Sequence, residues 1–365
     1  MSRFARTAPG PKSSLTARRS LRFGAQVILH LTAVTAVFLL AVGIGTVRVE
    51  AGTILEIVLH RLNLRQLPEA RAAELTPLIA IIWDVRLPRV IMAFIVGASL
   101  SLAGAVMQSI LRNPLASSYT IGVSSGASLG AAFAVTLGLG TLWGVWTMPL
   151  AGSVTGVLTV VLVMGLSLKL DRNMENHTII LVGMVMQLFF GGILTLLMSL
   201  SRETMQTLVL WQMGSFQGMG WLQLAVLAPI LLVIGTLIGT RSHSLDLLSF
   251  GEHQAFTMGV NVRTEKPLLL FLAAVLTGSA ISFAGVIGFI DLVAPHVVRR
   301  IYGAKHRLVL PLSALWGGAF MILSDLLSRT LLSPRELPVG AITAIAGAPF
   351  FWYIFFRSRK ERGRL

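Results

Sequence analysis

Residues that could carry out chemistry are few in this chain. The sequence has no G-x-x-x-x-G-K-[ST] loop, which would cradle nucleotide phosphates, and no H-E-x-x-H pair, which would bind zinc. It has no cysteine, which excludes a thiolate nucleophile, a thiolate metal site and a disulfide framework. The seven histidines are scattered and form no cluster of metal ligands. We therefore expect no catalytic residue, no metal site and no cofactor bound by this chain.

Three arginines and one acid stand out because charge is expensive inside an apolar segment. Arg86 and Arg89 flank a proline directly before an apolar run, and Asp325 lies four residues before Arg329. That spacing predicts an ion pair along one helix, which we favour over a proton relay. The arginines could anchor the chain at a membrane interface. Alternatively, they could pair with carboxylates of an external partner, because guanidinium binds carboxylate in a bidentate geometry.

A polar segment at 247–260 interrupts the apolar sequence and is long enough for a short helix, but too polar to cross a membrane. Ala255 and Gly259 are four residues apart, so they would form a smooth patch on one helical face. Such a helix could dock in a groove of another protein. An ordinary surface helix is the alternative.

Composition limits the elements that can position these residues. The chain has 365 residues, of which 55% are hydrophobic and 12% charged, and its net charge is +15. A soluble domain carries about 25% charged residues. With a mean hydropathy of +0.79, an ordinary soluble enzyme is excluded. A basic nucleic-acid-binding tail is excluded too, because such tails are poor in apolar residues.

Apolar runs near the length that crosses a bilayer recur along the chain, and they lack the strict alternation of barrel strands. Because unpaired backbone groups are costly in hydrocarbon, these runs predict helices. We therefore predict an all-α, polytopic membrane protein of about ten transmembrane helices. One transmembrane domain, 24–356, is expected between a basic N-terminal tail, 1–23, and a basic C-terminal tail, 357–365. The expected helices are at 24–45, 89–111, 119–138, 148–168, 178–199, 222–240, 267–290, 293–303, 309–328 and 338–356.

The basic residues predict the orientation. With the N-terminus inside, most of the 30 Lys and Arg residues fall on the inner side. The positive-inside rule then places both termini in the cytoplasm of a bacterial cytoplasmic (inner) membrane. The basic N-terminal tail could also bind anionic lipid. The net charge is therefore a topology signal, and we expect no nucleic-acid partner.

An internal repeat is visible at an offset of 181 residues. Five predicted crossings separate the two copies, so the second copy is expected to be inverted, as in many transporters. The small residues of this repeat and of a following ladder predict close helix packing, or a seam along which helices slide. The matched positions are Leu87, Ala93, Gly97, Ser101, Ala103, Gly104, Leu111 and Pro114 with Leu268, Ala274, Gly278, Ser282, Ala284, Gly285, Leu292 and Pro295. The ladder consists of Gly122, Gly126 and Gly130.

The order and spacing of several short motifs over residues 80–357 resemble the permease subunits of ATP-binding-cassette importers for iron-siderophores, haem and cobalamin. This is the type II importer family, whose permease has ten helices. The motifs are Arg86-Leu-Pro-Arg89, Gly97 to Gly104, Arg112-Asn-Pro-Leu-Ala116, Ile121-Gly-Val-Ser-Ser-Gly-Ala127, Gly251-Glu252 to Gly259-Val260, Phe283-Ala-Gly-Val-Ile-Gly-Phe289, Ala294-Pro-His296, Glu336-Leu-Pro-Val-Gly340 and Gly347-Ala-Pro349.

The resemblance implies partners. A permease of this family works as a dimer, with a second copy of itself or a paralogous permease. It assembles with two cytoplasmic ATPase subunits, which bind ATP and Mg, and with an extracytoplasmic substrate-binding protein. The chain would then be no enzyme, and its surroundings would be membrane lipid.

The resemblance also implies roles for particular residues. The coupling helix would contact the ATPase through Gly251, Glu252, Ala255, Gly259 and Val260. Phe256 and Met258 stand where the family pattern leads us to expect smaller or aliphatic side chains. Docking of the binding protein would involve Arg86, Arg89 and Arg329. The translocation path would be lined from the fifth span by Met184, Met186 and Gln187.

The favoured function is therefore the permease subunit of an importer for a ferric siderophore, with haem or cobalamin as alternative cargo. An ion-coupled secondary transporter is a less favoured alternative, since few acids or histidines lie within the spans. A membrane-embedded enzyme would need a polar catalytic cluster, which the sequence does not contain.

Overall fold

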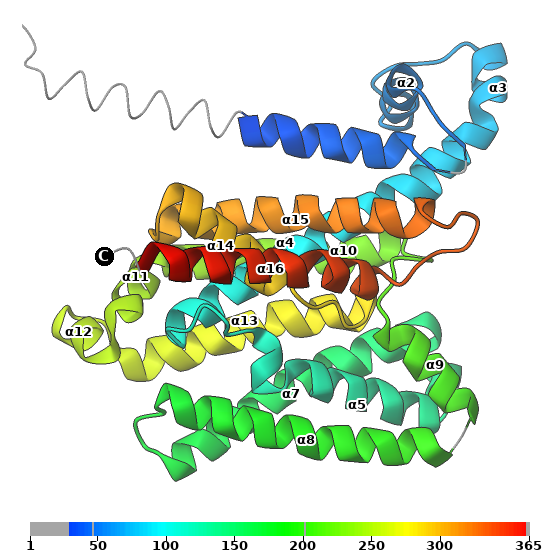
Figure 1. Cartoon of the computed structure of the whole chain (residues 1–365). Coiled ribbons are helices and arrows are strands. Elements are labelled where there is room, and N and C mark those ends of the chain that lie inside the picture. The colour runs from blue at the N-terminus through cyan, green and yellow to red at the C-terminus, as the bar shows by residue number, and fades with distance from the viewer. Residues whose placement is uncertain (1–28, 46, 201, 363–365) are drawn as a thin grey trace, which may run out of the picture.

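The computed structural model describes residues 29–45, 47–200 and 202–362, which form helices and no strand. The predicted N-terminal tail, 1–23, lies outside these residues. The helices lie side by side in a bundle (Figure 1). Six are long and apolar enough to cross a membrane by length and composition. The all-α, polytopic class is confirmed, while the count of ten crossings stays a prediction.

Each predicted apolar run has a helix at its position. The first is the helix Leu29–Gly43. The others are α4 (Leu87–Ile110), α5 (Val123–Thr136), α7 (Thr147–Leu170), α8 (Asn176–Leu200), α10 (Trp221–Thr240), α13 (Val262–Ala284), α14 (Ile290–Tyr302), α15 (His306–Thr330) and α16 (Val339–Arg362). The expected C-terminal tail therefore begins inside α16.

Shorter helices fill the connections. The amphipathic α2 (Ala51–Arg61) buries Ile54 and Ile57. The π-helix η1 (Ala80–Arg86) joins α3 (Glu69–Ile79) to α4, so one continuous helix runs through 42 residues instead of beginning at 89. The remaining ones are η2 (Ser118–Ile121), α6 (Gly140–Trp143), η3 (Gly144–Trp146), α9 (Arg202–Gln212), α11 (Ser242–Phe250) and α12 (Glu252–Thr257).

The seventh predicted span ends earlier than its hydropathy suggests. Gly285 stops α13 with φ +77°, in the left-handed region that favours glycine. A Cβ at this position would lie 2.1 Å from the carbonyl oxygen of Trp211. The apolar residues that follow form an irregular segment leading to α14, so the predicted end at residue 290 was wrong.

The two copies of the repeat pack across each other. The repeat relates α4 to α13; α4 packs against α15, while α13 packs against α7. At Gly97 a Cβ would lie 2.3 Å from the carbonyl oxygen of Gly317, so α4 and α15 touch through their backbones. At Gly152 a Cβ would lie 3.1 Å from Oγ of Ser282, where α7 meets α13. In Figure 1, α4 ends and α13 begins at the same end of the bundle, so they run in opposite directions.

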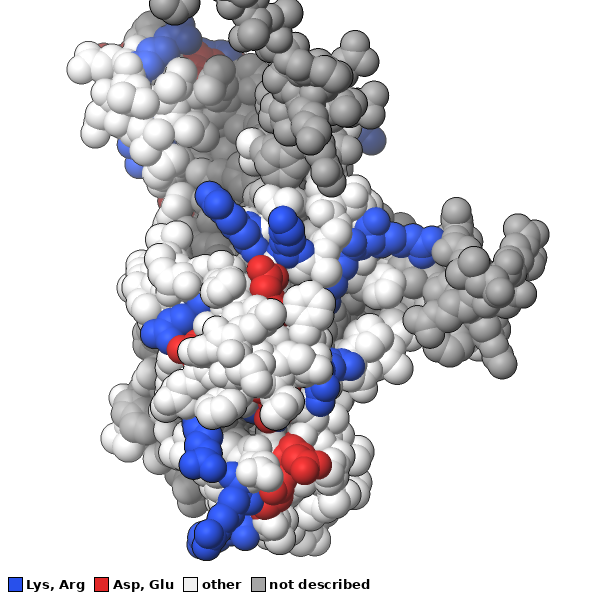
Figure 2. Space-filling model, turned by 90° about the vertical axis from the view of Figure 1, so that its left-hand side faces the viewer, with Lys and Arg blue, Asp and Glu red and all other residues white. Residues whose placement is uncertain are grey.

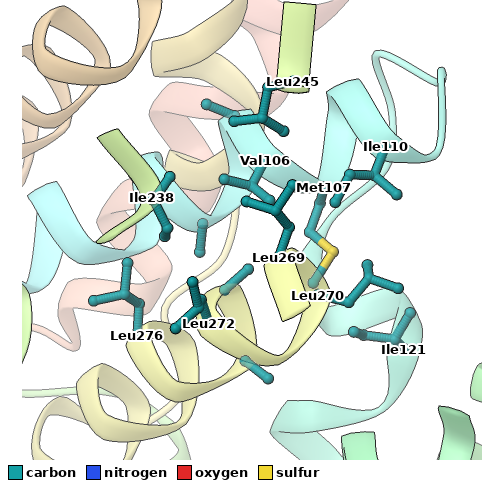
Figure 3. Packing of buried hydrophobic residues seen from close by; sticks show 14 of the residues in the cluster. Val106, Met107, Ile110, Ile121, Ile238, Leu245, Leu269, Leu270, Leu272 and Leu276 are labelled. Carbon is teal, nitrogen blue, oxygen red and sulfur yellow. The ribbon is translucent and has the colours of Figure 1, made fainter. Parts of the chain in front are cut away.

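The largest buried cluster ties these helices to α11. Figure 3 shows Val106 and Met107 of α4 close to Leu269 of α13, with Ile238 of α10 and Leu245 of α11 beside them. We call the end of the bundle that carries α11 and α12 the α12 end, and the opposite end, with α2 and α3, the α3 end (Figure 1). The core therefore holds α11 in place. We call the bend formed by α11 and α12 the α11–α12 elbow.

Candidate functional site

The α11–α12 elbow projects from the α12 end and is shaped by two glycines. Gly251, between the helices, has φ +132°, and Gly259, after α12, has φ +89°. Both angles lie in the region that favours glycine. At Gly251 a Cβ would also lie 2.2 Å from Oε1 of Gln254. These two residues therefore bend the chain, whatever else they contact.

The predicted contact residues of this elbow mostly face inward. Ala255 is fully buried, Val260 and Gly251 are buried and Glu252 is half-buried, so Gly259 alone of the five is exposed. Three large apolar side chains point outward instead: Phe250 is 73% exposed, Phe256 69% and Met258 67%. We call these three residues the apolar tip.

Sequence reasoning treated Phe256 and Met258 only as departures from a pattern. The outward direction of Phe256 could have been predicted from the sequence, because a helix turns about 100° per residue. If Ala255 faces the core, residue 256 cannot share its face. Figure 2, which looks onto this end, shows Lys and Arg side chains spread over it, with acids in fewer places. An apolar tip on such a basic surface fits a protein partner better than lipid.

A chain of polar contacts ties α11 to three other helices at this end. His306, at the start of α15, pairs through Nδ1 with Oδ1 of Asp246 at 2.7 Å. Its Nε2 lies 2.5 Å from Oγ of Ser109 in α4. Arg299 of α14 donates from Nη2 to the same Oγ at 2.8 Å and from Nη1 to Gln108. The elbow is thus fastened to α4, α14 and α15.

At the α3 end, the arginines predicted for docking are engaged inside the chain. Arg86 is buried and donates to the carbonyl oxygens of Val42, Gly43 and Val47 at 3.1, 3.2 and 2.6 Å. These carbonyls lie at the end of the helix Leu29–Gly43 and just beyond it, where no further helical turn supplies N–H donors. Arg86 therefore fastens the first helix to η1.

Arg89 is the centre of a buried ion cluster. Its guanidinium donates to Oδ1 of Asp325 at 2.9 and 2.8 Å and to the two carboxylate oxygens of Glu336 at 2.8 and 3.1 Å. The predicted pair of Asp325 with Arg329 is confirmed at 3.3 Å, but Asp325 is shared with Arg89. Arg329 also donates to the carbonyl oxygens of Ile44 and Ala41. A docking role for these arginines stays a prediction.

The predicted path residues do not share one face of α8. Met184 and Gln187 are exposed, whereas Met186 is buried in the main core cluster. Most of α8 is open, since only 22% of its most apolar 18-residue stretch is buried. At the α3 end, a cavity of about 540 Å³ lies between the α5–α7 connection, α9 and α13. Its lining includes Trp211, Met219 and Phe283 and no charged side chain.

The predicted small residues lie at close helix contacts. A Cβ at Gly104 would lie 2.0 Å from the carbonyl oxygen of Asp291, and one at Gly126 would lie 1.9 Å from Oγ1 of Thr159. Gly130 approaches Thr155 equally closely, and Ser101 fills the space beside Gly317. Gly122 instead forms the turn before α5, with φ +85°. Within the described ranges, no group of three or more His, Cys, Asp or Glu could hold a metal ion.

Comparisons with known proteins agree over most of the chain. The model of the FecCD transport family matches residues 33–357. The chain is 41% identical over 281 residues to an uncharacterized ABC transporter permease protein of Bacillus subtilis, covering 77% of this chain and 80% of that protein. It is 38% identical over 282 residues to the cobalamin import system permease protein of Halobacterium salinarum, covering 77% and 74%. A solved structure, described as an inward-facing ABC transporter of the metal-chelate type, matches with TM-score 0.78 at 29% identity, covering 92% of this chain and 99% of that one.

Proposed function

The chain belongs to the FecCD transport family of ABC importer permeases, and we propose that the cargo it passes is a ferric siderophore. As a permease subunit it is a transport component and not an enzyme. The observation that supports the cargo is the likeness, over nearly the whole chain, to a transporter of the metal-chelate type. A ferric siderophore is a metal chelate, with iron enclosed by an organic ligand.

Cobalamin is a second candidate, because a relative at 38% identity is a cobalamin import permease. Haem is a third candidate, because a relative at 35% identity is a hemin transport permease. The test is uptake into vesicles containing the permease, its ATPase and its binding protein, with labelled ferric siderophore, haem and cobalamin offered separately. Saturable, ATP-dependent uptake of the ferric siderophore alone supports the proposal, and uptake of another chelate replaces it. Uptake driven by an ion gradient without the ATPase would favour a secondary transporter.

The assembly follows the same proposal. Two ATPase subunits, which bind ATP and Mg, sit at the α12 end on the cytoplasmic side of an inner membrane, and both chain termini lie on that side. The basic surface of Figure 2 supports this orientation, because positive charge favours the cytoplasmic side. The exposed length of α8 fits contact with a second permease copy or a paralogue, with Met184 and Gln187 towards the path. Lipid would cover the remaining apolar helix faces.

The elbow supplies the ATPase contact. We propose that the apolar tip, Phe250, Phe256 and Met258, enters a groove of the ATPase together with Gly259. The inward-facing residues of the elbow, Gly251, Ala255 and Val260, give it its shape. Burial of large apolar side chains is the main favourable term of such contacts. Replacing the tip by polar residues should release the ATPase in a pull-down from native membranes.

The binding protein docks at the α3 end. If its acidic residues reach Arg86, Arg89 and Arg329, these guanidinium groups must exchange internal acceptors for external carboxylates. Such an exchange is salt-dependent, because it replaces buried pairs by pairs at an interface. Docking measured at several salt concentrations tests this, and a salt-independent affinity contradicts it.

A further inference from the structure

Lys266 is a buried cation near the start of α13, and nothing in the family pattern above uses it. Its side chain is 2% exposed, and it is one of the largest fully buried side chains among the described residues. Burying an ammonium group is costly unless it is paired and hydrogen-bonded. The contacts that compensate for its burial therefore indicate what this lysine holds together.

Two oxygens from separate elements accept hydrogen bonds from the ammonium group. Nζ lies 2.6 Å from Oε1 of Glu252, the first residue of α12. It also donates to the carbonyl oxygen of Met174 at 2.5 Å. Met174 lies in the turn between α7 and α8, two residues before α8 begins. One lysine, with three donors, thus links α12, α13 and the start of α8.

The turn that carries Met174 is itself held in a fixed shape. The carboxylate of Asp171 accepts the backbone N–H groups of Glu175 at 2.7 Å and Asn173 at 3.0 Å. These bonds lower the pKa of Asp171. Asn176, the first residue of α8, donates to the carbonyl oxygen of Ile110 at 3.0 Å. A displacement of the Met174 carbonyl therefore shifts the whole turn and the first residue of α8.

We propose that Lys266 is a positioning residue that makes α12 and the start of α8 move as one unit, so that the state of the ATPase reaches the helix beside the path. This rests on the proposed function, in which α12 contacts the ATPase and α8 borders the path. A ligand shifts a conformational equilibrium only through contacts that differ between the two states. Without Lys266, a change felt by α12 is no longer carried to α8 by a direct bond.

The variant that tests this keeps the site filled. Lys266→Met has a similar length and removes the charge, and Glu252, with 28% of its side chain exposed, can be hydrated instead. The elbow also stays fastened through Asp246 and His306. The fold is therefore expected to survive, which permits a test of coupling.

The matched control uses the ion pair of Glu265, the residue directly before Lys266. Arg241 and Glu265 form another ion pair at the same end, between the end of α10 and α13, without touching α12 or the α7–α8 turn. Arg241→Met therefore removes another ion pair of α13 at this end, whose cation is more exposed, 41% against 2% for Lys266. A general loosening of this end would affect both variants, whereas loss of the specific link affects only Lys266→Met.

The first experiment uses the complete importer in proteoliposomes. With Lys266→Met we expect ATPase association and basal hydrolysis to persist, while stimulation by loaded binding protein and cargo uptake each fall about tenfold, a typical size for coupling between two sites. Lys266→Arg should restore part of both, and Arg241→Met should behave as wild type. Wild-type coupling in Lys266→Met, or an equal loss in Arg241→Met, overturns the inference. A wild-type complex without ATPase stimulation overturns the proposed function as well.

The second measurement does not depend on activity. The chain contains no cysteine, so Gln254→Cys and Arg172→Cys place two spin labels on exposed positions of α12 and the α7–α8 turn in an otherwise label-free protein. Pulsed electron paramagnetic resonance, on an importer in which one permease copy carries both labels, should give one narrow distance, unchanged between nucleotide-free and ATP-bound states. In Lys266→Met the distance should broaden and differ between the states. A distance that shifts equally in both proteins overturns the inference.

Discussion

The two ends of the bundle use buried charge alike but differ in where large apolar side chains are exposed. At the α3 end, Arg89 joins α4 to Asp325 and Glu336; at the α12 end, Lys266 joins α13 to Glu252. Both clusters connect segments far apart in the sequence. Large apolar side chains remain exposed at both ends, at the α12 end as the apolar tip and at the α3 end at Leu331 and Leu332, directly after α15. Charges fasten the bundle at both ends, and the α12 end differs in that its exposed apolar side chains lie within residues 250–258, on the elbow.

The two charge clusters also differ in what remains when the cation is removed. Asp325 is 1% exposed, so without Arg89 it would keep only Arg329 as a charged partner and no water could replace the lost guanidinium. Glu252 is partly exposed and can be hydrated. We therefore expect loss of the arginine to affect folding and loss of the lysine to affect coupling.

The largest effect is expected for Arg89→Ala. Removing one partner of a buried ion pair costs about 3–5 kcal/mol, because the other charge remains buried. Thermal unfolding of the purified permease in detergent should show a clear drop in the midpoint. The double variant Arg89→Ala/Asp325→Asn should recover part of it, since the carboxylate that lost one of its two arginines is then neutral. A single variant as stable as wild type would remove the distinction between the two ends.

A smaller effect on folding but a complete effect on coupling is expected for Gly259→Trp. No heavy atom lies within 4 Å of a Cβ at this position, so the ring has space and projects from the elbow. The left-handed backbone costs roughly 1–2 kcal/mol for a residue with a Cβ. Docking of the binding protein should persist while its stimulation of ATP hydrolysis is lost. Normal stimulation in reconstituted vesicles would show that the elbow surface does not contact the ATPase.

The apolar tip can be tested with Phe256→Ser. A phenylalanine side chain buried at an interface contributes about 1.5–3 kcal/mol, so ATPase affinity should fall roughly 10- to 100-fold. Thermal stability of the isolated permease should not change, because the ring is exposed there. Leu64→Ser, which removes an equally exposed apolar side chain at the α3 end, is the control. Equal losses in the two variants would mean that the tip is not a specific surface.

The smallest effect is expected for Asp171→Asn, which weakens the turn before α8. Backbone N–H groups lower the pKa of Asp171, so the charged carboxylate stabilises the turn above its unfolded pKa. This contribution is lost as the pH falls through the lower, folded pKa. The variant should be slightly less stable than wild type at pH 7, and the two should converge only as the pH falls well below the usual Asp pKa of about 3.9. If the stability difference between Asp171→Asn and wild type grows in acid, the charged carboxylate is not what stabilises the turn.

The positions of the helices could be predicted because long apolar runs have few alternatives in a membrane. Their ends were less predictable: hydropathy reads Val286 and Ile287 as a continuation of α13, but the backbone at Gly285 prevents it. The docking assignment relied on where arginines fall along the chain. Arg89 meets Asp325 across 236 residues, and no local pattern predicts that contact.

The elbow shows the same limit in a different form. Its existence and its glycines followed from the sequence, but which residues face outward depends on how α12 rests on α13. Nothing in the sequence distinguishes Lys266 from the other Lys and Arg residues of the inner side. Its role depends on Glu252 and on the Met174 carbonyl, a backbone atom that a list of side chains omits.

The crossed packing of the two repeats has a consequence for biosynthesis. The face of α4 around Gly97 is closed by Gly317 of α15, which the ribosome adds 220 residues later. Until α15 has been synthesised, α4 is inserted in the membrane but lacks the helix against which it packs most closely. The N-terminal half therefore cannot complete its folding alone, and a nascent chain that stops before α15 should be a substrate for membrane quality control.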